Sequence, residues 1–317
     1  MKNKKIILSG AGTVQLIQDS CAFSSVPLLQ VAACGICATD RKGFFAPPAS
    51  MKLPLVPGHE FCGIHVATGR RVVVWPAISC GHCSLCRRGK VNLCKELKLF
   101  GLHCDGGYQL QFTLSHSLAE KVVLLEIPSC LSWTQATMTE PLACVIHSFA
   151  MVQDIPETIC IYGAGLMGRL AARLVHHKWP HCQIEILDPD PIRQKLADEM
   201  YLEGGVDCVF MACTSETAVS TALKRLKPGG EMLMFSGLER HLNPISIDYN
   251  QIHRMEQTLR GTYGCLPEDM VQALELMAAG TVVVDDLITG VIPLERVPES
   301  LAKIGNPYEF KTVIQFD

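Results

Sequence analysis

A glycine-rich loop between a strand and a helix constrains the fold of this chain more than any other feature. An apolar, β-branched run, Thr-Ile-Cys-Ile-Tyr, is followed at once by Gly163, Gly165 and Gly168 and then by a helix-like pattern. The first glycine allows a tight turn, the second lets the backbone approach a pyrophosphate, and the third lets the helix pack on the strand. The start of such a helix also attracts phosphate. The segment therefore predicts a dinucleotide-binding fold.

Strands and helices alternate on both sides of this loop, which indicates a parallel sheet joined by crossover helices. We expect residues 142–264 to form a Rossmann-type, doubly wound α/β domain. The expected strands are 158–162, 183–187, 206–212, 231–236 and 259–263, and the expected helices are 163–177, 191–201 and 218–226.

An acidic residue identifies the expected cofactor. Asp188 ends the strand after the loop, twenty residues past Gly168. A carboxylate there accepts hydrogen bonds from the adenosine ribose and repels a 2′-phosphate, which favours NAD over NADP. Arg193 either flanks the same ribose or lies on a solvated helix face, and both interpretations stay open. Leu166 and Met167 of the loop complete the expected cofactor-binding residues.

The first 130 residues have a different pattern, with short β-type runs separated by glycine and proline. We expect a β-rich domain over residues 1–141 and 265–317, with a helix at 267–279 and a last strand at 310–316 that rejoins it. An earlier Gly-x-Gly, at Gly10 and Gly12, has no helix-like pattern after it, and we expect a β-turn there. The other expected strands of this domain are residues 28–33, 71–75, 109–114 and 121–127.

Four cysteines within fifteen residues form the clearest metal signature: Cys80, Cys83, Cys86 and Cys94. Four thiolates suit a tetrahedral zinc ion, and a site closed by four sulfurs is structural. An iron–sulfur cluster is the first alternative, but bacterial runs continue Cys-x-x-x-Cys-Pro, which this chain lacks. Disulfides are the second alternative. We expect a structural zinc lobe at about residues 79–95.

A second set of donors is less conspicuous. A catalytic zinc needs few protein ligands of mixed type and an open position, and Cys37 and His59 with one or two carboxylates meet that need. Each residue has an alternative interpretation. Cys34 and Cys37 match a redox dithiol spacing, His59 alone suits an ordinary polar residue, and Glu140 alone suits a helix start.

These pieces together resemble the zinc-dependent medium-chain alcohol and polyol dehydrogenases, in the order that this family has them. The Glu-Pro-Leu element is similar to the branch of sorbitol, threonine and sugar-alcohol dehydrogenases. The matching pieces are Gly-Ile-Cys-x-Thr-Asp (35–40), Gly-His-Glu (58–60), the cysteine quartet, Asp-Gly-Gly-Tyr (105–108), Glu-Pro-Leu (140–142), the glycine loop and Lys-Pro-Gly-Gly (227–230).

The resemblance implies a GroES-like catalytic domain beside the Rossmann domain, and two zinc ions per chain. It implies that Cys37 and His59 hold a catalytic zinc, with Glu60 and Glu140 as direct, exchangeable or water-mediated ligands that the sequence does not rank. It places Thr39 near the substrate oxygen. The zinc would act as a Lewis acid on an alcohol whose hydride passes to NAD. Lys42 stands where many relatives have a relay histidine, and it either binds an anionic substrate or is simply solvated.

Composition excludes several other functions. The net charge is −3 with no basic block, which gives no footprint for nucleic acid, and no apolar run is long enough for a membrane span. Sixteen cysteines fit a reducing, cytoplasmic location. We therefore expect an oxidoreductase acting on a secondary alcohol, polyol or sugar alcohol, with or without a phosphate group, in a homodimer or homotetramer. The alternatives are a physiological ketone or sugar-phosphate reductase and a non-enzymatic NAD-binding protein.

Overall fold

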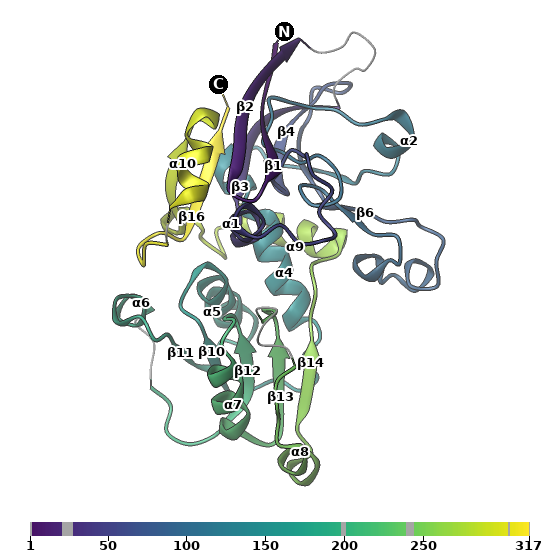
Figure 1. Ribbon diagram of the computed structural model, residues 1–317. Helices are drawn as coiled ribbons and strands as arrows, with labels where there is room; N and C mark the ends of the chain where they lie inside the picture. The colour runs from purple at the N-terminus through teal and green to yellow at the C-terminus, as the bar shows by residue number, and fades with distance from the viewer. Residues whose placement is uncertain (1, 21–27, 198–200, 239–243, 304, 317) are drawn as a thin grey trace. The chain divides into compact units, whose positions relative to one another are not determined.

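The computed structural model describes residues 2–20, 28–197, 201–238, 244–303 and 305–316, and the chain divides into two compact units. The first unit contains Met1–Ala143, Cys265–Gly280 and Val284–Asp317, and the second contains Cys144–Gly264 and Thr281–Val283. Figure 1 labels the elements of both units. Within the described residues, no helix combines the length and the apolar character needed to cross a lipid bilayer.

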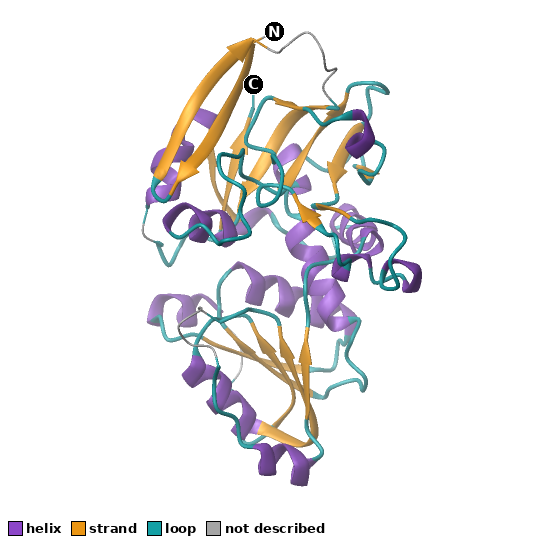
Figure 2. Cartoon of the chain, turned by 45° about the vertical axis from the view of Figure 1, so that its right-hand side comes forward, coloured by secondary structure: helices purple, strands orange, loops and turns teal. Residues whose placement is uncertain are grey.

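The second unit is built on a five-stranded parallel sheet in the order β11-β10-β12-β13-β14. Three of its strands, β10, β11 and β12, contain the buried β-branched residues that parallel sheets favour, and Figure 2 shows the sheet between helices. The elements are β10 (Thr158–Tyr162), α5 (Leu166–Lys178), β11 (Gln183–Leu187), α6 (Pro191–Ala197), β12 (Val206–Met211), α7 (Glu216–Arg225), β13 (Leu226–Met234), α8 (Tyr249–Met255) and β14 (Thr258–Gly261).

Within the described residues, this order matches the doubly wound strand order 3-2-1-4-5-6, except that no strand corresponds to strand 3. The predicted parallel Rossmann-type sheet is confirmed. The outer edge of β11 is covered in part by the side chain of Gln194, which accepts from the Asp188 N–H at 2.7 Å and donates to the Ile186 carbonyl at 2.8 Å. This amide replaces two ladder hydrogen bonds of a neighbouring strand. It therefore blunts the edge against pairing with another chain.

The first unit contains a seven-stranded mixed sheet, in the order β15-β16-β3-β4-β5-β9 with β8 also paired to β3, and two two-stranded antiparallel sheets, β1-β2 and β6-β7. Its strands are β1 (Lys2–Gly10), β2 (Thr13–Ser20), β3 (Leu29–Ile36), β4 (Glu60–His65), β5 (Arg71–Val74), β6 (Ala77–Ile78), β7 (Lys98–Leu99), β8 (Gln111–Phe112), β9 (Leu124–Glu126), β15 (Ile288–Ile292) and β16 (Lys311–Gln315). Its helices are α1 (Ala38–Phe45), α2 (His116–Ala119), α3 (Trp133–Ala136), α9 (Pro267–Ala278) and α10 (Val297–Ala302), and α4 (Thr139–Phe149) continues into the second unit.

A buried aromatic cluster forms the centre of the first unit. Phe61, Phe100 and Phe112 lie with their ring centroids 4.8 to 5.9 Å apart, in tilted and edge-on contacts that aromatic rings prefer. The predicted last strand does rejoin this unit, because β16 pairs with β3 from Thr312 opposite Ile36 onward. The turn expected at Gly10 and Gly12 is also present, between β1 and β2.

Candidate functional site

The glycine loop has the backbone geometry that its sequence predicts. Gly163 follows β10 directly with a φ of +112°, a conformation that a side chain would strain. A Cβ on Gly168 would stand 1.8 Å from the carbonyl oxygen of Gly163, so only glycine fits there. Gly165 is the N-cap of α5, and the helix therefore begins at Leu166 and not at Gly163 as predicted. The open cradle at this helix start fits a pyrophosphate.

Asp188 and Arg193 lie beside this loop. The carboxylate of Asp188 accepts a hydrogen bond from the Ala164 N–H at 2.8 Å and another from the Asp190 N–H at 2.9 Å. A Cβ built on Gly165 would stand 3.5 Å from a terminal nitrogen of Arg193. The strand and helix thus bring an acceptor and a cation to the rim of the cradle, where the ribose and phosphates of a dinucleotide would lie.

The candidate catalytic donors gather at the ends of two neighbouring strands of the first unit. Cys37 follows β3 and caps α1, His59 precedes β4, and Glu60 is the first residue of β4. One ligand atom from each of the three lies within 4.8 Å of the others. Thiolate, imidazole and carboxylate suit zinc, so the residues present fit this metal.

The charges around His59 support this fit. Burial on its own lowers the pKa of His59, but Cys37, Asp40 and Glu140 together raise it well above the ordinary value. The surroundings of the imidazole are therefore strongly negative, as a cation site requires. Glu140 lies in the first turn of α4, outside the group formed by the other three donors, although its charge acts on His59.

Asp40 contacts both Cys37 and His59 and so positions these two donors. Its Oδ2 accepts from the Cys37 N–H at 2.9 Å and from the Tyr108 hydroxyl at 2.8 Å, while its Oδ1 faces Nδ1 of His59 at 3.8 Å. This leaves Nε2 of His59 for a metal, an arrangement typical of metal-binding histidines. Burial raises the pKa of Tyr108 well above its ordinary value, so its hydroxyl stays a donor. The hydroxyl of Thr39 lies 3.6 Å from the Cys37 sulfur.

Lys311 is the functional residue that sequence reasoning missed. Its ammonium lies 2.8 and 2.5 Å from the two carboxylate oxygens of Glu60, and the exposed fraction of both side chains is 2%. It also donates to the Ile36 carbonyl at 3.4 Å. The signal in the sequence is a lysine between Phe310 and Thr312 at the start of an apolar run, but lysines are mostly exposed.

The cysteine quartet also converges. The four sulfurs lie within 4.8 Å of one another, with 3.5 Å between Cys83 and Cys86 and 3.9 Å between Cys80 and Cys86. A tetrahedral zinc–thiolate site with bonds of about 2.3 Å has edges of roughly 3.8 Å, so the quartet fits zinc. Backbone N–H groups of Cys86 and Lys95 lower the pKa of Cys83 to about 6, which favours the thiolate. Every described cysteine is free, which disfavours the disulfide alternative.

The structure also shows the surroundings of Cys34 and Lys42, whose roles the sequence left open. Cys34 is fully buried in β3, and burial raises the pKa of its thiol well above the ordinary value, which disfavours a redox dithiol with Cys37. Lys42 is exposed on α1.

Comparison with known proteins gives the family. Residues 26–126 match the family model described as "Alcohol dehydrogenase GroES-like domain". The chain is 26% identical to L-galactonate-5-dehydrogenase of Escherichia coli (strain K12) and 28% identical to D-altritol 5-dehydrogenase of Agrobacterium fabrum, each over 91% of both proteins.

Solved structures agree with this fold. A proposed zinc-binding dehydrogenase from Sinorhizobium meliloti, bound to NADP, superposes with a TM-score of 0.88 and 25% identity over the whole of both chains. The fold of the chain agrees with that of this solved structure. The chain thus carries an alcohol dehydrogenase GroES-like domain at residues 26–126 and is similar over nearly its whole length to polyol and zinc-binding dehydrogenases.

Proposed function

We propose that this protein is an NAD- and zinc-dependent dehydrogenase that oxidises a secondary hydroxyl of a polyol, a sugar alcohol or a related sugar derivative. The observation that carries the proposal is the convergence of Cys37, His59 and Glu60, with the Thr39 hydroxyl beside the Cys37 sulfur. The relatives named above act on an altritol and on a galactonate, which are both rich in secondary hydroxyls.

Each residue has a role that follows from its position. Cys37 and His59 would hold the catalytic zinc, with Glu60 or Glu140 as a further or exchangeable ligand. Asp40 keeps His59 oriented, and Thr39 offers the hydroxyl that takes the proton of the substrate alcohol. When bound, zinc would polarise the alcohol oxygen and NAD would accept the hydride.

The second unit supplies the cofactor site in this proposal. The backbone at Gly163, Gly165 and Gly168 would hold the pyrophosphate, and Leu166 and Met167 start the helix whose N–H groups point toward it. Asp188 would accept the ribose hydroxyls, with Arg193 at the rim.

The remaining parts of the proposal concern stability and assembly. The quartet of cysteines would hold a second, structural zinc that orders the loop-rich lobe around it. We also propose a homodimer or homotetramer and a cytoplasmic location, where reducing conditions keep the cysteines free.

A screen of polyols, sugar acids, amino alcohols and sugar phosphates for NADH formation tests the function. We expect at least one of the hydroxyl-rich compounds to yield NADH. If the zinc-loaded protein binds no dinucleotide and reduces none with any compound, the proposal is wrong.

A further inference from the structure

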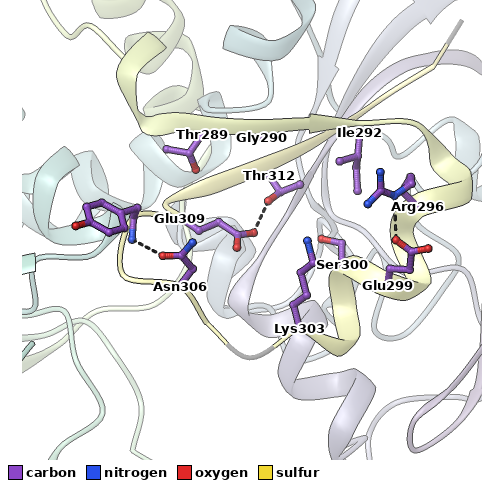
Figure 3. A pocket seen from close by; sticks show the side chains of 11 residues that line it. Thr289, Gly290, Ile292, Arg296, Glu299, Ser300, Lys303, Asn306, Glu309 and Thr312 are labelled. Atoms are coloured by element: carbon purple, nitrogen blue, oxygen red, sulfur yellow. Dashed lines mark hydrogen bonds and ion pairs between the residues drawn. The ribbon is translucent and has the colours of Figure 1, made fainter. Parts of the chain in front are cut away.

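A cavity of about 310 Å³ lies in the first unit, away from the donors described above. Successive residues of β16 point to opposite faces of the sheet. Lys311 turns to Glu60, and Thr312 lines the cavity. The cavity therefore lies on the other side of β16 from the candidate zinc ligands. Its walls come from β15, α10 and the segment that leads into β16 (Figure 3): Thr289, Gly290, Ile292, Arg296, Glu299, Ser300, Lys303, Asn306, Tyr308, Glu309 and Thr312.

Two polar groups of the lining are available to a ligand. The residue Ser300 is only 6% exposed, and its hydroxyl makes no hydrogen bond within the described residues. The ammonium of Lys303, three residues later, forms no close ion pair with a described carboxylate, although its charge acts on Glu309. Because both residues line the cavity (Figure 3), a ligand or water there can satisfy these groups.

The charges of the lining favour a single negative charge in this place. Glu309 is neutralised by Arg41 at 2.8 Å and Glu299 by the Nε of Arg296 at 2.9 Å. The charge of Lys303 also acts on Glu309. Three cations, Arg41, Arg296 and Lys303, therefore stand against two carboxylates, which leaves one positive charge in excess. Within the described residues only the Nε of Arg296 is bonded to Glu299, so its two terminal nitrogens are left for a further acceptor. An excess positive charge, a hydroxyl and a guanidinium edge suit a carboxylate.

The rest of the lining suits hydroxyl groups. Glu309 and Thr312 are hydrogen-bonded to each other at 2.7 Å, and both have lone pairs left for a ligand. The side-chain oxygen of Asn306 accepts from the Tyr308 N–H, and within the part of the chain that the structure describes its amide N–H groups are left for a ligand. The volume lies at the lower end of the range for small-molecule sites.

We propose that this cavity is a second ligand site, which binds a small hydroxy acid with its carboxylate on Lys303, Ser300 and Arg296. The ligand's hydroxyls contact Glu309, Thr312 and Asn306. Glu309 also holds Arg41 of α1, the helix that begins at Cys37 and carries Thr39. A bound hydroxy acid therefore touches a side chain that anchors the catalytic helix.

Titration calorimetry of the zinc-loaded protein with gluconate tests this site. We expect gluconate to bind, and Lys303→Met to weaken that binding at least tenfold, since a charge-assisted hydrogen bond is lost. Ser300→Ala should weaken it about threefold to tenfold. Lys121 is an exposed lysine of the same unit, and Lys121→Met should leave gluconate binding unchanged. Thr39→Val alters the candidate catalytic site and should also leave gluconate binding unchanged, which separates the two sites.

Two further ligands define the chemistry. Sorbitol, which lacks the carboxylate, should bind at least tenfold more weakly than gluconate at this site, and inorganic phosphate should not exceed gluconate. The proposal is overturned if gluconate does not bind, if Lys303→Met binds it as the wild type does, or if sorbitol or phosphate binds the site as well as gluconate. None of these results depends on NADH formation, so the proposed function can fail or hold independently.

Discussion

At the scale of single residues, the buried pair of Lys311 and Glu60 most changes the picture of the site. Both side chains are almost fully buried, and a buried charge without a partner is costly. The ammonium of Lys311 therefore holds the Glu60 side chain in place beside Cys37 and His59. The sequence indicated the three donors because Cys, His and Glu carry metal chemistry wherever they stand. It gave no such indication for Lys311, since only the pairing of β16 with β3 brings it to Glu60.

Replacing Lys311 tests this pair. Lys311→Met leaves the Glu60 charge buried and alone, and we expect the free energy of unfolding to fall by about 3–5 kcal/mol. Adding Glu60→Gln to that variant removes the unpaired charge and should restore part of the loss. Denaturant unfolding measures both variants, with Lys121→Met as an exposed control. Equal stability of Lys311→Met and the wild type would contradict the role given to this lysine.

In the proposed function, Asp188 determines the preference for NAD over NADP. Asp188→Asn keeps a hydrogen-bond acceptor beside Ala164 but removes the negative charge. We expect the Kd for NAD to rise roughly tenfold, because a charged hydrogen bond becomes a neutral one, and the preference for NAD over NADP to narrow. Fluorescence titration with both dinucleotides measures this. The exposed Asp154→Asn is the matched control, and an unchanged ratio of the two Kd values would count against the assignment.

At the scale of elements, the sequence predicted the second unit better than the first. The bounds of β10 and β11 agree with the prediction, because buried parallel strands are short apolar runs with clear ends. The predicted helix at 191–201 extends over residues outside the described ones, and α6 is described as far as Ala197. In the first unit, β8 has only two residues where six were expected. Such short strands are set by pairing between distant segments, which local sequence does not encode.

The contact between α5 and β10 depends on one glycine. A Cβ at Gly168 would overlap the carbonyl oxygen of Gly163, so we expect Gly168→Ala to lower the free energy of unfolding by about 1–3 kcal/mol and to weaken dinucleotide binding. Gly261→Ala, in β14 of the same sheet, meets no atom within 4 Å and should change stability by less than about 0.5 kcal/mol. A similar loss of stability in both variants would show that close packing at Gly168 does not cause the loss.

At the scale of the whole molecule, each unit has its own core and its own part of the chemistry. The first unit brings together the candidate zinc donors, and the second carries the glycine loop proposed to bind a dinucleotide. Motifs spread along the chain predicted this division, because each motif is local and each has a chemical reason. The contacts of Tyr108 with Asp40 and of Lys311 with Glu60 were not predictable in the same way, since each joins distant segments of the chain.

The central claim is that Cys37 holds the zinc at which a hydroxyl is oxidised, while the cysteine quartet holds a separate, structural zinc. NADH formation by Cys37→Ser, with the zinc content of the same sample, tests this claim most directly. We predict about two zinc ions per chain in the wild type, and about one in a folded Cys37→Ser variant that forms no NADH with a compound that the wild type oxidises. A Cys37→Ser variant that forms NADH at the wild-type rate, or a fully active wild type with only one zinc per chain, would contradict it.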